Sequence, residues 1–168
     1  MTVTGGPDTF AVSSPYGVAM GVTGWLTVGF TGSRNLSADR ADWIDRLLVP
    51  NIDCAEYVTG ACVGVDECIA RSVAKHHPTA VNTIIVPADR SRVSEDFLTD
   101  MHDAGANIIY MPVGTTYRDR NQRIVDWSEL LIGLPDKPEH DYRSRRSGTW
   151  QTIRLAWESN KPTHIYIG

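Results

Sequence analysis

The sequence predicts a three-layer α/β domain, in which helices cover both faces of a mostly parallel sheet of about six strands. From residue 25 onwards, short apolar runs alternate with amphipathic stretches, and the turns between them are short. Such alternation is typical of parallel strands joined by right-handed helical crossovers. The chain has 168 residues, of which 42% are apolar and 21% charged. This size and composition suffice for one domain that buries its core without disulfides or metals.

The first 24 residues differ from the rest of the chain. They are rich in Gly, Ser, Thr and Val, and they contain neither a basic start nor a continuous apolar core. The segment is therefore neither a signal peptide nor a membrane span. We expect either a flexible tail or an edge hairpin formed by residues 9–12 and 18–22.

Three strand–turn–helix units fill the first part of the domain. The strands are expected at residues 25–30, 56–59 and 82–86, which are apolar or β-branched. Ser37 is placed to cap the first helix, and Gly105 is placed to end the third. Each helix has one apolar face at helical spacing. These faces are Trp43, Ile44, Leu47 and Leu48; Val65, Ile69 and Val73; and Val93, Phe97 and Met101.

The second part of the chain continues the alternation. A fourth strand at residues 107–111 stops at Pro112, and a helix carrying Arg120 leads to a buried strand at residues 130–134. A helix at residues 150–157 and a strand at residues 163–167 complete the domain. We therefore predict a single Rossmann-like domain over residues 25–168.

The loops that follow the strands show where a ligand would bind, because open parallel sheets bind ligands beyond the carboxyl ends of their strands. Three of the five loops combine glycine with a hydroxyl residue, and two carry arginine near the strand end. Glycine lets a backbone approach a phosphate, and hydroxyls and guanidinium groups donate to its oxygens. Ordinary turns also use Gly and Ser, so the loops count only together. They are residues 31–34, 60–66, 87–90, 114–116 (with Gly114 and Thr115) and 135–149.

The start of the last helix is the best single candidate for an anion site. Ser147 is a plausible N-cap, and Gly148 and Thr149 leave backbone N–H groups free to point at an anion. Arg120 and Asn121 lie on the preceding helix. An ordinary serine-capped junction has the same local sequence. We predict that Arg120 and Gly148 face one common anion pocket.

Charge and cysteine content narrow the function further. A net charge of −4 argues against a broad nucleic-acid surface, although a local basic patch can coexist with it. The three cysteines are odd in number and lie in or beside predicted core elements, which favours reduced thiols and a cytoplasmic setting, and they form no CxxC pair. The histidines lack metal-ligand spacing, so we expect no metal site.

Five motifs, taken in order, resemble a known group of proteins. They are TGSR after the first strand, GACVGVDECIAR, VPAD, RNQRIVDWSELLIGLP and SGTWQTIRLAWESNKPTHIY. This pattern is similar to the SLOG superfamily. That superfamily joins the DNA-processing protein A (Smf) family, the "lonely guy" phosphoribohydrolases and the YspA- and YpsA-like nucleotide-binding proteins. The YspA-like branch matches best, because it shares the TGSR start, the G-A-x-G-x-D turn, the PAD element and the RN pair.

The resemblance implies several binding residues. Arg120 matches the arginine that phosphoribohydrolases place beside the ribose phosphate, and with Asn121 it matches the RN pair of the DNA-processing family. Gly148 and Thr149 match the Gly-Thr of the PGGxGTxxE signature. The two glycine-containing turns match phosphate-side turns; their residues are Gly32, Ser33 and Arg34, and Gly60, Gly64 and Asp66.

The chain also departs from that signature. Residues 136–146 are inserted after Leu134-Pro135, and the usual catalytic glutamate is replaced at Gln151 and Thr152. An amide or hydroxyl cannot stabilise positive charge on a ribose as a carboxylate does, so cleavage by the usual route is in doubt. Arg120, Asp66 and Glu139 are the candidate catalytic residues, with Asp89 as a further carboxylate. The insert is either a solvated loop or a lid, closed by Arg143, Arg145 and Arg146.

Three functions therefore remain open. The chain is expected to bind or sense a nucleotide or nucleoside phosphate, with no obligatory cofactor. Alternatively it cleaves a nucleoside 5′-monophosphate as an N-glycosidase, or it binds single-stranded DNA. The acidic balance makes nucleic acid the least favoured partner, and no membrane partner is expected. A homodimer or higher homo-oligomer is implied by the resemblance alone.

Overall fold

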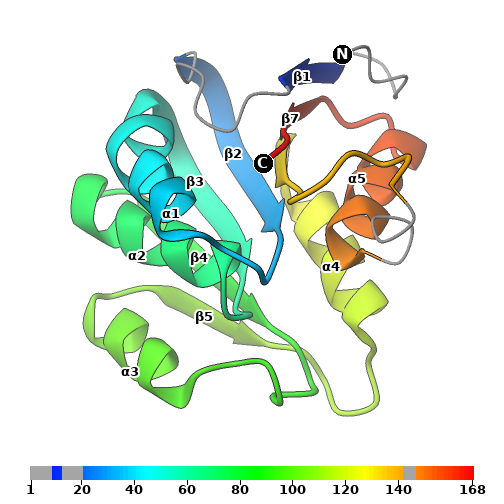
Figure 1. Cartoon of the computed structure of the whole chain (residues 1–168). Coiled ribbons are helices and arrows are strands. Elements are labelled where there is room, and N and C mark those ends of the chain that lie inside the picture. The colour runs from blue at the N-terminus through cyan, green and yellow to red at the C-terminus, as the bar shows by residue number, and fades with distance from the viewer. Residues whose placement is uncertain (1–8, 13–20, 142–146) are drawn as a thin grey trace.

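The computed structural model has seven parallel strands in one sheet, with the order β1-β7-β6-β2-β3-β4-β5. It describes residues 9–12, 21–141 and 147–168. The strands are β1 Thr9–Val12, β2 Val22–Gly32, β3 Ile52–Gly60, β4 Val81–Val86, β5 Asn107–Tyr110, β6 Leu130–Leu134 and β7 Thr163–Tyr166. The predicted α/β class and the mostly parallel sheet are confirmed (Figure 1).

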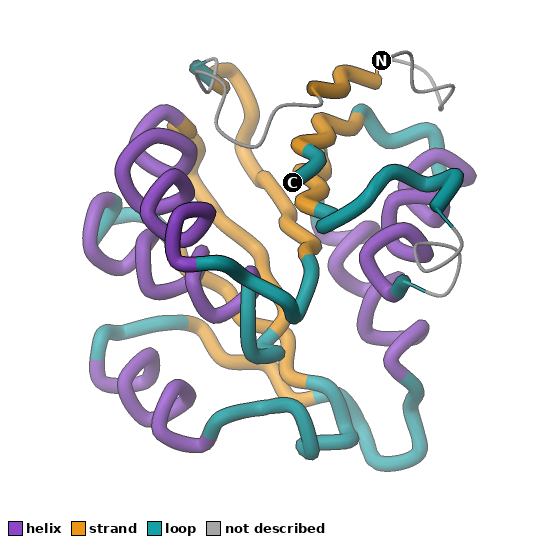
Figure 2. The backbone as a smooth tube through the Cα atoms, in the orientation of Figure 1, coloured by secondary structure: helices purple, strands orange, loops and turns teal. Residues whose placement is uncertain are grey.

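Helices cover both faces of this sheet (Figures 1 and 2). The helices are α1 Ala38–Trp43, α2 Val65–His76, α3 Glu95–Asp103, α4 Tyr117–Trp127 and α5 Gly148–Glu158. On one face, α1 and α2 enclose Phe30, Tyr57 and Ile132, and α3 extends this layer over β4. On the other face, α4 and α5 pack against Val58 and Leu131. All five residues of β6 are buried, which explains its unbroken apolar sequence.

The order of the strands reverses beside β2. From β2 the chain builds outward through β3, β4 and β5, and then crosses to the other side of β2 to form β6 and β7. The loops after β2 and β6 therefore leave neighbouring strands in opposite directions. Such a switch point opens a crevice beyond the carboxyl ends of the strands.

Several predicted boundaries need correction. β2 begins at Val22 rather than at residue 25, and β3 begins at Ile52 rather than at residue 56. Thr9–Val12 is an edge strand, but it pairs in parallel with β7 and so is not one arm of a hairpin. Residues 18–20 of the proposed second arm lie outside the described residues.

The first helix also differs from its prediction. Ser37 caps it as expected, with its Oγ accepting from the backbone N–H of Arg40 at 3.2 Å. A π-helical turn, η1 Ile44–Leu48, and a 3₁₀ turn, η2 Val49–Asn51, follow α1. Because a π turn accommodates more residues than an α turn, it rotates the side chains that follow. Ile44 and Leu48 are buried, but Leu47, which the sequence placed on the same face, is 41% exposed.

In the described part of the chain, no helix has both the length and the apolar character that crossing a membrane requires.

Asp45 in the π turn ties this segment to α2. Its carboxylate accepts from Ser72 Oγ at 2.8 Å and Lys75 Nζ at 2.7 Å, and it lies 3.1 Å from His76 Nε2. The hydrogen bond from Lys75, together with those from Ser72 and His76, lowers the pKa of Asp45 to about 2. Asp45 is therefore stabilised as a carboxylate in the folded state.

Replacement of Asp45 by asparagine should lower the free energy of unfolding by about 1–2 kcal/mol near neutral pH, after allowance for solvent screening. A depressed carboxyl pKa stabilises the fold above the ordinary pKa, and this stabilisation is lost as the pH falls through the folded-state value. The deficit should therefore shrink between about pH 4 and about pH 2. Urea unfolding across this range measures it. Asp42→Asn is the matched control, because Asp42 pairs with Arg46 on the exposed surface. An equal deficit in both variants would contradict the assignment.

Candidate functional site

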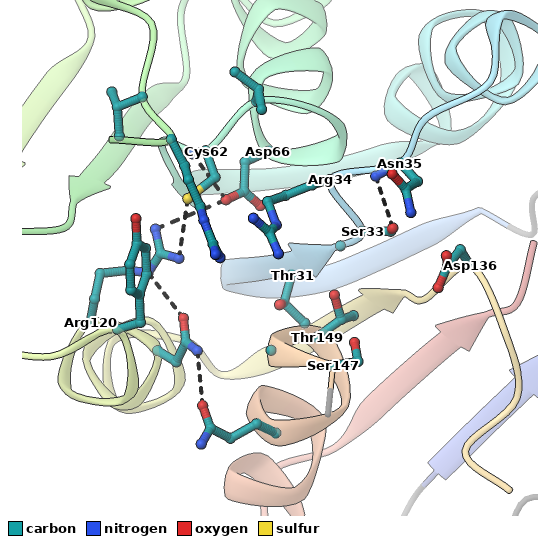
Figure 3. A pocket seen from close by; sticks show the side chains of 18 of the residues that line it. Thr31, Ser33, Arg34, Asn35, Cys62, Asp66, Arg120, Asp136, Ser147 and Thr149 are labelled. Carbon is teal, nitrogen blue, oxygen red and sulfur yellow. Dashed lines mark hydrogen bonds and ion pairs between the residues drawn. The ribbon is translucent and has the colours of Figure 1, made fainter. Parts of the chain in front are cut away.

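A cavity of about 990 Å³ lies at the switch point, beyond the carboxyl ends of β2 and β6. Figure 3 shows its walls, which come from segments far apart in the sequence. The lining residues are 31–35, Cys62, Val63, Asp66, 91–94, Tyr117, Arg120, Asn121, Asp136, Lys137, 147–149 and Gln151. The loops after β2 and β6 and the first residues of α5 thus share one space with α2 and α4.

The start of α5 forms one wall of the cavity. Ser147 is the N-cap, and its Oγ accepts from the backbone N–H of Trp150 at 3.4 Å. The first backbone N–H groups of a helix have no partner within the helix, so those of Gly148 and Thr149 are available beside the cavity that both residues line. The helix dipole adds a positive potential at this end. The local structure predicted for residues 147–149 is confirmed.

Arg120 reaches the cavity from α4. Thr116 and Asp119 form a capping box that begins this helix one turn earlier. The Arg120 side chain is 6% exposed. Its Nε donates to Asn121 Oδ1 at 3.0 Å, and its Nη2 lies 3.7 Å from Cys62 Sγ. Among the described residues, Nη1 has no hydrogen-bond partner. Nη1 is itself buried against Gly60 of β3, so among these residues Arg120 has one donor nitrogen without a partner inside the wall of the cavity.

Asp66 lies opposite Arg120, in the first turn of α2. Its Oδ2 is 4.0 Å from Arg120 Nη1 and accepts from the backbone N–H of Cys62 at 3.3 Å. A separation of 4.0 Å exceeds hydrogen-bond length, so the two charges attract each other without a direct bond. Burial raises the pKa of Asp66, and the attraction of Arg120 and the Cys62 amide oppose this change.

Cys62 is not equipped as a nucleophile. Burial and the neighbouring Asp66 charge raise the pKa of its thiol, although the charge of Arg120 opposes them. A raised pKa disfavours the thiolate, which is the reactive form. Cys62 thus serves as a weak hydrogen-bond acceptor for Arg120 rather than as a reactive group.

A polar chain links the three helices around the cavity (Figure 3). It runs from Asp66 on α2 to Arg120 and Asn121 on α4, and then to Gln151 on α5. The last step is a long contact of 3.5 Å from Asn121 Nδ2 to Gln151 Oε1. Asn121 thereby fixes the guanidinium of Arg120 on one side and reaches α5 on the other.

Gly32, Gly60 and Gly64, which the sequence placed in phosphate-side turns, pack closely against other parts of the protein. A Cβ atom at Gly32 would lie 2.2 Å from Val65 Cγ1, and one at Gly60 would lie 2.3 Å from Arg120 Nη1. At Gly64, which has φ +99°, a Cβ would lie 2.6 Å from the Cα of Arg34. Each of these glycines thus leaves room for another part of the protein. Only Gly32 of the three lines the cavity.

Most of the other predicted binding residues do meet in the cavity. They are Ser33, Arg34, Asp66, Arg120, Asn121, Ser147, Gly148 and Thr149. Gly114 and Thr115 do not line it; they follow β5, which is the edge strand and is separated from β2 by β3 and β4. There Gly114 adopts φ +90°, and Thr115 Oγ1 donates to Pro112 O at 2.6 Å. Their loop is an ordinary turn.

The catalytic candidate Glu139 is also placed elsewhere. Its Oε1 pairs with Arg154 Nη1 at 3.3 Å, and Glu139 is not among the lining residues. The proposed lid arginines, Arg143, Arg145 and Arg146, lie outside the described residues. At the start of the insert, Asp136 and Lys137 do line the cavity, and the carbonyl of Lys137 accepts from Trp150 Nε1 at 2.9 Å.

Sequence reasoning missed Tyr117 and Arg92. Tyr117 precedes Arg120 by one helical turn, and the guanidinium groups of Arg92 and Arg120 each lie 5.6 Å from the centre of its ring. The i, i+3 spacing from Arg120 was a usable signal for Tyr117. No sequence signal indicated Arg92, because its position depends on how the loop between β4 and α3 folds back onto the β3–α2 turn.

Nothing in the described residues suggests a metal centre: no three His, Cys, Asp or Glu side chains group in a way that could hold an ion.

Comparison with known proteins shows the fold. No family model matches the chain, and a search of curated proteins finds no match. Among solved structures, it is similar to DNA processing protein A (DprA) from Streptococcus pneumoniae, with a TM-score of 0.62 and 15% sequence identity. The match covers 84% of this chain and 50% of the DprA chain, so this chain spans about half the length of that protein. The two share an α/β fold of the Rossmann-like kind.

Gly32→Ala should destabilise the protein by about 1–3 kcal/mol, because the new methyl group would overlap Val65, which is fully buried. Urea unfolding gives the free energy. Gly148→Ala is the control, since a Cβ there meets nothing within 4 Å. Similar stability of the two variants would show that β2 and α2 do not pack as closely as described.

Proposed function

We propose that this protein binds a nucleotide or a nucleotide-derived phosphate in the cavity beside β2 and β6, and that it is a member of the SLOG superfamily. The observation that carries the proposal is that Arg120 and the amino-terminal residues of α5 line the same cavity. A buried arginine and a helix N-terminus are complementary to the same kind of ligand, an anion. The YspA-like branch of the superfamily remains the best match to the motifs.

The charges around the cavity support an anionic ligand. Its lining contains the cationic side chains of Arg34, Arg92, Arg120 and Lys137, against the carboxylates of Asp66 and Asp136. The whole chain carries a net charge of −4, so this local excess of positive charge runs against the overall balance. A compact basic cavity in an acidic chain favours a small anion over an extended nucleic-acid surface.

The size and chemistry of the cavity suit a phosphate that carries a larger organic group. At about 990 Å³ it is at the upper end of the usual range for small-molecule sites. The hydroxyls of Ser33, Ser147 and Thr149 provide donors in addition to the charged groups. Similarity to a DNA processing protein is in keeping with a nucleotide-related ligand, although the likeness itself is one of fold.

Binding is favoured over cleavage because the usual carboxylate has no substitute on α5. Thr152 is fully buried, and its Oγ1 donates to Gly148 O at 2.8 Å, so it serves the helix rather than the cavity. Gln151 does line the cavity, but its side chain is an uncharged amide. A positively charged ribose in a cleavage transition state would therefore meet no carboxylate from α5.

Nucleotides should stabilise the protein against heat, and Arg120→Lys should weaken their binding by about tenfold, because lysine loses the planar guanidinium, whose Nε donates to Asn121 and so fixes the charge beside the cavity. A screen of nucleoside mono- and diphosphates by thermal shift measures the effect. A ligand at a hundredfold its dissociation constant adds about 2.7 kcal/mol of stability. The control is Arg123→Lys on the same helix, because Arg123 is exposed over Trp127 and does not line the cavity.

Three outcomes would count against this function. A wild-type protein that no nucleotide stabilises would remove it. Equal weakening by Arg120→Lys and Arg123→Lys would place the ligand elsewhere. Tight, salt-sensitive binding of single-stranded DNA without nucleotide binding would favour the DNA-binding alternative instead.

Incubation with nucleoside 5′-monophosphates should release no free base above background, since no carboxylate occupies the position of Gln151 or Thr152. Chromatographic detection of free base over several hours tests this expectation. The protein without Arg120, as Arg120→Met, gives the background. Base release by the wild type that this variant lacks would establish the N-glycosidase alternative, with Asp66 or Asp136 as the acting carboxylate.

A further inference from the structure

The cavity contains one group that opposes its proposed ligand. Asp66 is 7% exposed and lines the same space as Arg120 and the start of α5. Two negative charges close together in a poorly hydrated site repel each other strongly. If a phosphate binds there, as proposed above, the Asp66 carboxylate must either move, accept a hydroxyl of the ligand, or lose its charge.

The surroundings of Asp66 hold it in place. It lies in the first turn of α2, and its Oδ2 accepts from the Cys62 backbone N–H. A Cβ on Gly60 would lie 2.5 Å from the same oxygen, so the β3 backbone closes one side. With the side chain packed on these two elements, movement out of the cavity is the least available of the three responses.

The charged and titratable groups around Asp66 come from four segments. Arg120 from α4 is the nearest cation, with Arg34 after β2 and Arg92 before α3 as further cations of the cavity wall; Cys62 lies after β3. None of these cations is at hydrogen-bond distance, since Arg120 Nη1 remains at 4.0 Å. Burial raises the pKa of Asp66 even though Arg120 and the Cys62 amide oppose it. The ionised form is therefore incompletely stabilised before any ligand arrives.

We propose that Asp66 becomes protonated when an anion occupies the cavity, and that its carboxylic acid then donates a hydrogen bond to an oxygen of the ligand. One proton passes from solvent to the Asp66 carboxylate, and no other bond is made or broken. The same event removes the carboxylate charge opposite Arg120, so the positive charge of Arg120 acts on the ligand alone. Asp66 thus couples anion binding to the uptake of one proton.

This coupling gives the affinity a definite pH dependence. Wherever free Asp66 is ionised and the bound form is protonated, the dissociation constant should rise up to about tenfold for each unit of pH. Replacing Asp66 by asparagine removes the proton but keeps an oxygen that can accept from Cys62 N–H. The variant should bind with little dependence on pH and should bind more tightly than the wild type at high pH.

The experiment uses inorganic sulfate and adenosine 5′-sulfate, because the charges of both stay constant between about pH 5 and about pH 9. A phosphate group is unsuitable, since its second pKa of about 6 lies within this range. Dissociation constants are measured across this range for the wild type, Asp66→Asn and the control Asp136→Asn, which removes the other carboxylate of the cavity. We expect a steep dependence for the wild type and the control, and a flat one for Asp66→Asn.

Two further measurements extend the test, and the first uses the wild type alone, so it does not depend on how the variant folds. Titration calorimetry in two buffers of different ionisation enthalpy counts the protons taken up on binding, which should be up to one. Without ligand, a raised carboxyl pKa stabilises the fold at low pH, and this contribution is lost as the pH rises through the folded-state value, so stability relative to Asp66→Asn should fall with rising pH.

The outcomes separate this inference from the proposed function. If neither sulfate compound nor any nucleotide binds, both fail. If they bind but take up no proton and show no pH dependence, only the role of Asp66 is overturned. If Asp66→Asn weakens adenosine 5′-sulfate and leaves inorganic sulfate unchanged, Asp66 accepts a ribose hydroxyl as a carboxylate, and the protonation proposal is wrong.

Discussion

The hydrogen-bonded pairing of β2 with β6 determines where this molecule can hold a ligand. Gly32 and Leu134 end their strands side by side, and the backbone N–H of Ser33 still donates to Leu134 O at 3.1 Å. From this point one loop runs to α1 and the other to α5, on opposite faces of the sheet. The gap between them cannot close, because each loop must follow its own helix. The cavity is thus a consequence of strand order.

A second buried arginine stabilises the rim of this opening. Arg40 on α1 is 5% exposed, and it donates from Nη1 to Pro135 O at 3.0 Å and from Nη2 to Tyr166 O at 2.6 Å. It joins α1 to the carboxyl ends of β6 and β7. Hydrogen bonds from a charged donor to buried carbonyls are among the stronger ones in proteins. Arg120 Nη1 has no hydrogen-bond partner among the described residues, whereas Nη1 and Nη2 of Arg40 both donate to backbone carbonyls. Two arginines of similar burial therefore differ in their contacts.

Local patterns predicted the elements well, and tertiary contacts explain where they did not. The apolar run of β6 and the serine cap of α5 are signals within a few residues, and both were located correctly. Gly114 and Thr115 looked as suitable for phosphate as the turn after β2, yet their strand lies at the edge of the sheet. Strand order is not readable from a single loop. Likewise, the sequence shows that Gly60 is a glycine, but only the fold shows that Arg120 and Asp66 fill the space a side chain would need.

The distance between Asp66 and Arg120 determines what the site can do. Had the two groups formed a direct hydrogen-bonded pair, each charge would be satisfied, and breaking the pair for a ligand would leave a buried charge uncompensated. At 4.0 Å, with Arg120 Nη1 unbonded among the described residues, neither group is fully stabilised by the other. The cost of burying both charges is thus only partly offset by their attraction. An anion at Arg120, with a proton on Asp66, would complete both environments at once. The incomplete pairing of Asp66 and Arg120 is therefore the feature on which the proposed anion site depends.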